Sequence, residues 1–326
     1  MIDVLAAKRR IAPYIRRTPL VESAWASDKA GARVWLKVES IQRTHSFKAR
    51  GAFNAVMARL ERGRLSPSRV HKDPAHSIVT ASAGNHGRGL AEAAATFGVP
   101  LTVFTPADAP RAKVDAIRRH GAELRADAPD YDEAERRAKA FARETGAEFI
   151  SPYSDADVIA GAATVALEIV EEQPDVDTFV VPIGGGGLVS GIGVVVKAID
   201  PSRAVVGVEL EASHPFTASL AAGRLVEIVP GETLADGLVG NPDPETITWP
   251  FIRRLVDRIA IVGEDDLRRA LVGLVAHEHL IAEGAGAASV AALVARRADV
   301  SGRRVAAIIT GANIDRARLA SLLQLS

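Results

Sequence analysis

Apolar residues along the chain follow two alternating patterns. Short runs of consecutive apolar residues predict strands, and longer amphipathic stretches between them predict helices. The predicted strands span residues 34–38, 77–80, 101–104, 148–150, 179–183, 205–209, 259–262 and 305–309. The predicted helices span residues 53–60, 86–97, 111–120, 131–145, 155–172, 188–199, 264–277 and 285–296. This alternation predicts an α/β fold with two open, mainly parallel twisted sheets flanked by helices.

The length of the chain bears on its domain organisation. A chain of 326 residues exceeds the length at which a single core stops growing, so we expect two domains. The polar stretch 61–76 and the acidic stretch 126–133 interrupt the regular pattern, and we interpret both as excursions of the chain outside its strands and helices. We place a smaller α/β domain at residues 62–146, inserted in a larger domain formed by residues 1–61 and 147–326.

Composition restricts the class of function. Forty basic residues balance forty acidic residues, which argues against nucleic-acid or membrane-surface partners recognised by bulk charge. The absence of cysteine excludes disulfides, thiolate metal sites and cysteine nucleophiles. The longest uncharged run, 178–196, contains Pro182 and six glycines, so we interpret it as a strand, a glycine loop and a helix start. With no apolar core of signal length at the N-terminus, we expect a soluble, cytoplasmic protein.

One lysine has an unusual setting. Lys48 lies in Ser46-Phe47-Lys48-Ala49-Arg50-Gly51-Ala52, after the uncharged residues 44–47 and at the predicted first turn of a helix. The positive end of the helix dipole and partial burial both disfavour a charged amine. A neutral amine is a nucleophile that can form a Schiff base. We therefore predict that Lys48 carries a covalent cofactor.

A run of four glycines, Gly184-Gly185-Gly186-Gly187, separates a predicted strand from a predicted helix. Glycines let the backbone approach a ligand closely, and a helix start favours anions. The motif lacks the Gly-Lys-Ser/Thr of a Walker loop, and the chain has no Gly-x-Gly-x-x-Gly fingerprint. A tight turn is the alternative, but such turns rarely need four glycines, so we favour a phosphate cradle.

Two further motifs follow predicted strands. Ser82-Ala83-Gly84-Asn85-His86-Gly87 could bind a carboxylate through its N–H groups, with Asn85 donating to a phenolate-type oxygen. A serine cap with a packed histidine explains the same residues equally well. Thr310, in Thr310-Gly311-Ala312-Asn313, ends the last strand, where ligands of open α/β folds bind. Taken alone, however, Thr310 fits a plain turn better.

Two isolated residues leave similar alternatives open. Glu209 closes a strand and could bind a hard cation together with backbone carbonyls, although a carboxylate that caps a loop is slightly favoured. His45, beside the lysine motif, could act as a proton shuttle, although a packed loop histidine is the simpler interpretation.

In this order, the motifs resemble those of the fold-type II pyridoxal-phosphate enzymes, and within them the threonine/serine dehydratase and serine racemase family. The resemblance runs from Arg17-Thr18-Pro19-Leu20 to Asn313, nearly the whole chain. It implies a tryptophan synthase β-like fold, pyridoxal 5'-phosphate as cofactor, a small amino-acid substrate and a homodimer. No regulatory domain is expected after the catalytic core.

The resemblance also implies a role for each motif. Lys48 would form the Schiff base with the cofactor, and Phe47 would lie against it. The remaining positions, with the roles that the family gives them, are Asn85 at the ring hydroxyl, Ser82, Ala83, Gly84 and His86 at the substrate carboxylate, Gly184, Gly185, Gly186, Gly187 and Leu188 at the phosphate, Thr310 at the pyridine nitrogen, and Gly237 and Glu283 lining the same site.

The implied reaction is α,β-elimination. The lysine amine would remove the α-proton of a 3-hydroxy amino acid, and loss of the β-hydroxyl would lead to a 2-oxo acid and ammonia. Threonine, serine and related compounds such as 3-hydroxyaspartate are candidate substrates. Racemisation and β-replacement are the alternatives. A hydroxyl at Thr310 does not hold the ring nitrogen protonated as a carboxylate would, which favours elimination.

Three departures from the family pattern qualify these expectations. Racemases of the group carry a second serine where this chain has Ala83, so dehydration is preferred to racemisation. His45 replaces a usual glycine and places a polar side chain near the substrate, which leaves room for an acidic or longer hydroxy amino acid. Glu209 and the Ser213 carbonyl match part of a Mg²⁺ or Ca²⁺ site, but Pro215 stands where the second acidic ligand would be.

Overall fold

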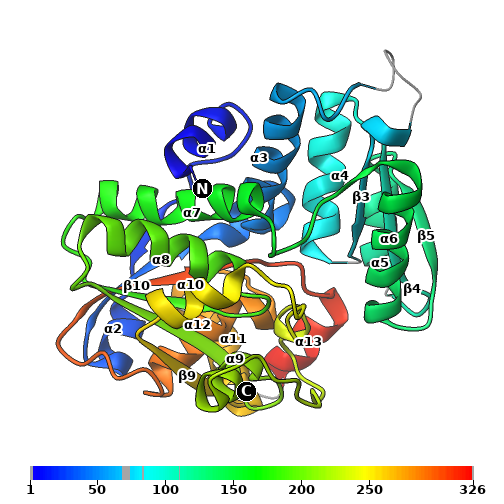
Figure 1. Cartoon of the computed structure of the whole chain (residues 1–326). Helices are drawn as coiled ribbons and strands as arrows, with labels where there is room; N and C mark the ends of the chain where they lie inside the picture. Colours follow the sequence, from blue (N-terminus) through cyan, green and yellow to red (C-terminus); the bar gives the residue numbers. More distant parts are fainter. Residues whose placement is uncertain (1–2, 68–73, 83, 110, 325–326) are drawn as a thin grey trace. The chain divides into compact units, whose positions relative to one another are not determined.

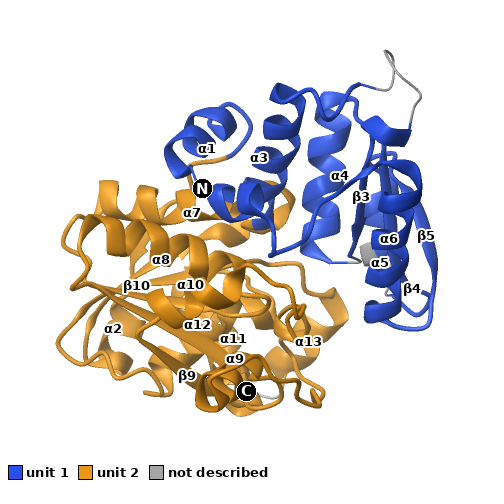
Figure 2. Cartoon of the chain, viewed as in Figure 1, with its two compact units in different colours: residues 1–15, 48–161 blue, residues 16–47, 162–326 orange. Residues whose placement is uncertain are grey.

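A computed structural model describes residues 3–67, 74–82, 84–109 and 111–324. The chain forms two compact units (Figure 2). Unit 1 consists of residues 1–15 and 48–161, and unit 2 of residues 16–47 and 162–326. Each unit has its own sheet, and Figure 1 labels the helices and several of the strands.

Unit 2 is built on a six-stranded sheet with the order β1-β2-β10-β7-β8-β9. The short edge strand β1 is antiparallel to β2, and all other neighbours are parallel. The strands are β1 (Leu20–Glu22), β2 (Arg33–Val38), β7 (Thr178–Pro182), β8 (Ala204–Leu210), β9 (Arg258–Val262) and β10 (Arg304–Ile309). The carboxyl ends of the five parallel strands therefore share one edge of the sheet.

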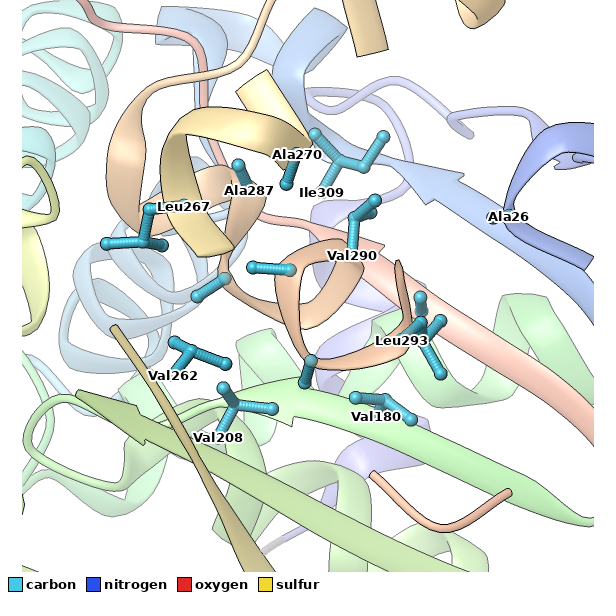
Figure 3. Close-up of a cluster of buried hydrophobic side chains, with 14 of the residues drawn as sticks. Ala26, Val180, Val208, Val262, Leu267, Ala270, Ala287, Val290, Leu293 and Ile309 are labelled. Carbon is cyan, nitrogen blue, oxygen red and sulfur yellow. The ribbon is translucent and has the colours of Figure 1, made fainter. Parts of the chain in front are cut away.

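Helices cover both faces of this sheet. They are α2 (Ala24–Ala30), α8 (Gly187–Ile199), α9 (Pro215–Ala222), α10 (Thr248–Leu255), α11 (Glu264–Glu278), α12 (Gly284–Val294) and α13 (Arg316–Gln324), together with the part of α7 (Ala156–Glu172) from residue 162 on. Figure 3 shows Val290 and Leu293 of α12 among strand residues such as Val180 and Val208. Side chains alternate along a strand, so the strand residues next in sequence to Val180 and Val208 point to the opposite face of the sheet, on which α8 packs.

Unit 1 is built on a smaller, fully parallel sheet with the order β5-β4-β3-β6. Its strands are β3 (Ile78–Ala81), β4 (Leu101–Pro106), β5 (Glu123–Ala128) and β6 (Glu148–Phe149), and its helices are α1 (Val4–Ile11), α3 (Lys48–Glu61), α4 (Asn85–Phe97), α5 (Arg111–Arg118) and α6 (Tyr131–Thr145). Ile78 and Val103 belong to the core shared with α3 and α4, whereas Val79 and Phe104 belong to the core shared with α6. Alternation along β3 and β4 thus supports a helical layer on each face.

The α/β fold with two mainly parallel sheets is confirmed, and each predicted helix and strand is found to within a few residues at either end. The interpretation of residues 126–133 as an excursion was wrong, because the stretch contains the end of β5 and the start of α6. Strand β5 is an edge strand in which exposed and half-exposed positions alternate. It therefore lacks the continuous apolar run that marked the other strands.

The compact units have different bounds from the two predicted domains. Residues 1–15, 48–61 and 147–161 fall within unit 1, whereas the prediction placed them in the larger domain. The reason is packing: α3 lies along α4, α1 packs on α3, and β6 pairs with β3. Within the described residues, no helix has the length and apolar character needed to cross a membrane.

A buried ion pair lies in unit 2 between β2 and α7. The Lys37 ammonium donates to a Glu168 carboxylate oxygen at 2.6 Å and to the Thr18 carbonyl, also at 2.6 Å. The side chain of Lys37 is fully buried and that of Glu168 is 8% exposed. Breaking a buried pair leaves one charge uncompensated, whereas replacing both partners with apolar groups removes the desolvation penalty.

We therefore expect Lys37→Met to lower the free energy of unfolding by about 3–5 kcal/mol. The double variant Lys37→Met/Glu168→Leu should recover most of this loss. Arg17→Ala, which breaks the exposed pair with Glu171, is the control and should change stability by less than about 1 kcal/mol. Chemical denaturation of the three variants tests the prediction, and a double variant no more stable than Lys37→Met would contradict it.

Candidate active site

Lys48 is the first residue of α3, as predicted. Its amine donates to the Pro152 carbonyl at 2.7 Å, within unit 1. Burial disfavours the ammonium and lowers the pKa of Lys48 from 10.5 to about 8. A substantial fraction of the amine is therefore neutral near physiological pH, as a nucleophile or general base requires.

The loop from Ser82 to Gly87 leads from β3 into α4, which begins at Asn85. The Ser82 hydroxyl oxygen accepts hydrogen bonds from the Gly84 and Gly87 N–H groups, at 3.2 and 3.1 Å. A side chain at Gly87 would collide with the Ser82 carbonyl, which explains the glycine. Ala83, the position that separates racemases from dehydratases in the resemblance, lies outside the described residues.

His86 is a buried, uncharged histidine. Its Nε2 lies 3.2 Å from the Ile150 carbonyl oxygen, and only 2% of the residue is exposed. Burial, reinforced by the charge of Lys48, lowers the pKa of His86 to about 3. The side chain therefore matches the packed-histidine alternative. A role at a substrate carboxylate would be left to its backbone N–H, in the first turn of α4.

The tetraglycine loop joins β7 to α8 in unit 2. Gly186 has φ +87°, and a side chain there would meet Ile252 and Thr248. No side chain caps the first turn of α8, and the Thr248 hydroxyl holds the loop by donating to the Gly185 carbonyl at 2.9 Å. Uncapped N–H groups at a helix start, in a loop whose close backbone packing requires glycine at position 186, fit a phosphate group.

The structure also places Gly237 beside this loop. A Cβ atom built on Gly184 would lie 3.3 Å from the Gly237 carbonyl oxygen. Gly237 belongs to a short 3-10 turn at residues 236–238, and Leu188, the first residue after the glycines, is buried in α8. Sequence patterns alone gave no signal for Gly237, since it lies 50 residues from the tetraglycine loop.

A second group of site residues surrounds Gly311, at the end of β10. The Phe47 N–H donates to the Thr310 carbonyl at 3.0 Å, and the Glu283 N–H donates to the Gly311 carbonyl at 3.0 Å. The Glu283 side chain lies directly against Gly311 and is largely buried. The Thr310 hydroxyl donates to the Ala285 carbonyl at 3.3 Å. Unit 2 thus brings together Phe47, Glu283 and Thr310, which are far apart in the sequence.

Thr44 and His45 both have left-handed backbone conformations, with φ +55° and +56°. This region costs a residue with a side chain about 1–2 kcal/mol relative to the right-handed helical region. Hydrogen bonds hold the loop in place: the Ala312 N–H donates to the His45 carbonyl, and the Asn313 amide donates to the Thr44 carbonyl. His45 is exposed, so it is not the packed histidine of the alternative interpretation.

The described residues fit the expected cofactor in each unit separately. In unit 2, the tetraglycine loop offers the phosphate cradle, and Thr310 offers one hydroxyl at the shared edge of the sheet. In unit 1, Lys48 offers a partly neutral amine and Asn85 stands at the start of α4. These are the residues that would hold pyridoxal phosphate, by its phosphate, ring nitrogen, aldehyde carbon and ring hydroxyl.

Glu209 and Ser213 do not fit a cation site. The buried Glu209 carboxylate accepts from the Phe216 N–H at 2.9 Å, the Thr217 N–H at 2.8 Å and the Thr217 hydroxyl at 2.6 Å. Both carboxylate oxygens are thus engaged at the start of α9, and Pro215 offers no side-chain ligand. Ser213 exchanges backbone hydrogen bonds with Leu210, and the described residues contain no cluster of three metal-ligating side chains.

The sequence interpretation of Glu209 as a loop cap is therefore closer to the structure than the cation site. Burial raises the pKa of Glu209, while the donors from Thr217 and Phe216 oppose that rise. Sequence reasoning missed Thr217, because no local pattern links it to Glu209, from which it is separated by eight positions in the chain.

The lowered pKa of Lys48 predicts a specific pH dependence in the cofactor-free protein. Reactivity of the Lys48 amine towards an acylating reagent should rise about tenfold per pH unit below pH 8 and level off above it. Exposed lysines should continue to gain reactivity to about pH 10.4. Mass spectrometry of the labelled peptides gives both profiles, and a Lys48 profile that parallels the exposed lysines would contradict the burial argument.

If Glu209 caps α9 and binds no cation, the free energy of unfolding should depend on its hydrogen bond from Thr217 and should not depend on divalent cations. Thr217→Val should lower the free energy of unfolding by about 1.5–3 kcal/mol, because a hydrogen bond to a buried carboxylate is lost. Thr96→Val, which removes an exposed hydroxyl-to-carbonyl bond within α4, is the control and should have little effect. A rise of several degrees in the wild-type melting temperature on adding Mg²⁺ or Ca²⁺ would show that a cation binds after all.

Comparison with known proteins agrees with this geometry. The model of the family described as pyridoxal-phosphate dependent enzyme matches residues 11–311. The chain is 39% identical to the L-threonine ammonia-lyase of Thermotoga maritima over 96% of its own length and 75% of that protein. It is 37% identical to the catabolic L-threonine dehydratase of Escherichia coli, over 98% and 94%. The solved structure of maize serine racemase superposes with a TM-score of 0.87 at 31% identity, covering 99% and 96%. The chain therefore belongs to the family of pyridoxal-phosphate dependent enzymes.

Proposed function

We propose that the protein is an ammonia-lyase that converts a 3-hydroxy amino acid into a 2-oxo acid and ammonia. The observation that carries this proposal is the Lys48 amine, whose pKa of about 8 lets it accept a proton and release it again near neutral pH. The L-threonine ammonia-lyase and dehydratase among the relatives support the same assignment.

In this proposal Lys48 is the general base. Its partly neutral amine takes the α-proton of the substrate, and the helix start at Asn85 offers N–H groups to the substrate carboxylate. The Pro152 carbonyl accepts a hydrogen bond from the amine at 2.7 Å, so it offers a resting position for the freed lysine. When bound, pyridoxal phosphate supplies an electron sink that lowers the pKa of the α-carbon.

Thr310 favours elimination over other outcomes. The Thr310 hydroxyl would donate to the pyridine nitrogen by turning its one proton away from the Ala285 carbonyl, but it carries no charge that would hold that nitrogen protonated. With such a partner the bound cofactor would be a weaker electron sink, which would favour departure of the β-hydroxyl. The hydroxyl leaves with one proton as water, and hydrolysis of the unsaturated amine takes up one water and releases ammonia.

Racemisation is the second candidate, because a solved relative is a serine racemase. A racemase of two-base type needs a proton donor on the opposite face of the α-carbon. The chain has alanine at position 83, where the resemblance predicts a serine in racemases. We therefore favour the lyase.

The direct test is an assay of ammonia and 2-oxo acid release by the cofactor-loaded enzyme with L-threonine, L-serine and both 3-hydroxyaspartate diastereomers. At least one of these should be turned over, and Lys48→Ala should lower kcat by at least about 10³-fold, the upper part of the range for loss of a general base. The visible absorbance of bound cofactor should change in Lys48→Ala as well.

Chiral analysis of the remaining substrate provides the discriminating measurement. The lyase proposal predicts that 2-oxo acid accumulates faster than the D-enantiomer. Formation of the D-enantiomer without ammonia would establish the racemase instead. Bound cofactor without turnover of any hydroxy amino acid would contradict both the lyase and the racemase assignment.

A further inference from the structure

We propose that His45 determines the substrate specificity of the site, and that it selects a 3-hydroxy amino acid with a second carboxylate on its β-carbon. The inference rests on the proposed lyase function and narrows its substrate class. It starts from a feature of the backbone: Thr44 and His45 are two successive residues with side chains in the left-handed region. Strained backbone of this kind gathers at functional sites when the surrounding structure holds it.

The loop is held from one side by the end of β10. Ser46 forms an antiparallel bridge with Gly311, the Ala312 N–H donates to the His45 carbonyl at 3.0 Å, and the Phe47 N–H donates to the Thr310 carbonyl at 3.0 Å. All of these contacts use the backbone. The fold therefore requires the left-handed conformation at position 45 but makes no use of the imidazole to obtain it.

Some other histidines in the described structure have packing or hydrogen-bonding roles, whereas His120 and His279 are exposed as His45 is. His86 bonds to the Ile150 carbonyl, His214 lies near the Leu210 and Glu211 carbonyls, and His277 stacks on Trp25. The His45 imidazole is exposed and has no hydrogen-bond partner within the described ranges. The exposed His45 imidazole is thus accessible to a ligand, and the Thr44 hydroxyl beside it is buried without a partner in the described ranges.

The chemistry of the loop favours an anionic ligand. From Gln42 to Lys48 the chain contains no acidic residue but carries Arg43, His45 and Lys48. Lys48, the proposed base, follows His45 by three residues, and Thr310 is bonded to the intervening Phe47. An imidazole can donate to a carboxylate, with added strength when it is protonated. The methyl group of threonine and the hydrogen of serine offer it no such interaction.

The chain provides a matched control for the backbone effect. His279 ends α11 and is also an exposed histidine in the left-handed region, with φ +56°. Glycine adopts this region without steric cost, so His45→Gly and His279→Gly relieve the same local conflict. A side chain retained only for folding would show the same behaviour in both variants.

The experiment compares wild type, His45→Gly, His45→Gln and His279→Gly as cofactor-loaded enzymes. For 3-hydroxyaspartate, kcat/KM should fall at least about tenfold in His45→Gly, as expected for loss of one hydrogen bond to a charged group. His45→Gln, which keeps a donor, should fall less. For L-threonine, kcat/KM should stay within about threefold in all variants, and His279→Gly should match wild type on both substrates.

Binding and stability are read independently of turnover. L-Aspartate has the second carboxylate but no β-hydroxyl to lose, and L-2-aminobutyrate has neither. His45→Gly should raise the Kd for aspartate, measured by calorimetry, at least about tenfold and leave that for 2-aminobutyrate unchanged. The melting temperature of both glycine variants should equal or exceed that of wild type, which shows that the imidazole is not needed for folding.

The outcomes separate the two proposals. A wild type that prefers threonine, with the threonine-to-hydroxyaspartate ratio unchanged in His45→Gly, overturns the specificity role and leaves the lyase function intact. An equal loss on every substrate, or a fall in melting temperature confined to His45→Gly, also overturns it. Absence of ammonia from every substrate refutes the lyase function. The Kd of aspartate in wild type and His45→Gly then still shows whether His45 binds a second carboxylate.

Discussion

The meeting of three chain segments at Gly311 is the interaction on which the site in unit 2 depends. The segment at residues 45–47 pairs with residues 310–312, and Glu283 bonds to the Gly311 carbonyl from the start of α12. A side chain at Gly311 would meet Glu283, and one at Gly286 would meet the Gly311 backbone, so this approach requires glycine at both positions. These contacts fix the backbone immediately before Lys48 to the end of a central strand. A small error there would displace Phe47, Thr310 and Glu283 together.

Two buried lysines show how local partners decide between structure and chemistry. The Lys37 ammonium donates to the Glu168 carboxylate, which compensates a full charge in the core of unit 2. The Lys48 amine donates to the neutral carbonyl of Pro152, and burial lowers its pKa to about 8. A carbonyl can accept a hydrogen bond from either the charged or the neutral amine. The Lys48 setting therefore permits proton transfer, whereas the Lys37 setting opposes it.

Most of the fold could be predicted because buried parallel strands and their covering helices leave strong periodic patterns. The predictions failed where burial is partial or contacts are distant. Strand β5 lies at an edge with half-exposed side chains, and α9 has little amphipathic pattern to detect. The site motifs were visible as glycine loops and as a lysine at a helix start. Two features that the sequence could not supply depend on three-dimensional contacts: Thr217 on the Glu209 carboxylate, and the left-handed backbone at His45. Gly237 was named only through the family resemblance, and its place beside Gly184 is likewise a three-dimensional contact.

The two loops that we predict to bind anions, one in each unit, share one physical device. Both the tetraglycine loop and the described residues of the segment 82–87 offer backbone N–H groups at the start of a helix, and neither set includes a charged side chain. Such groups bind any phosphate or α-carboxylate equally well, so they cannot distinguish one amino acid from another. The same device satisfies Glu209, whose charge is met by the start of α9 rather than by a cation. Discrimination between substrates must then come from the few side chains that stand outside these backbone cradles. The exposed imidazole of His45, on a loop held by backbone contacts alone, is one such side chain that the fold itself leaves unused.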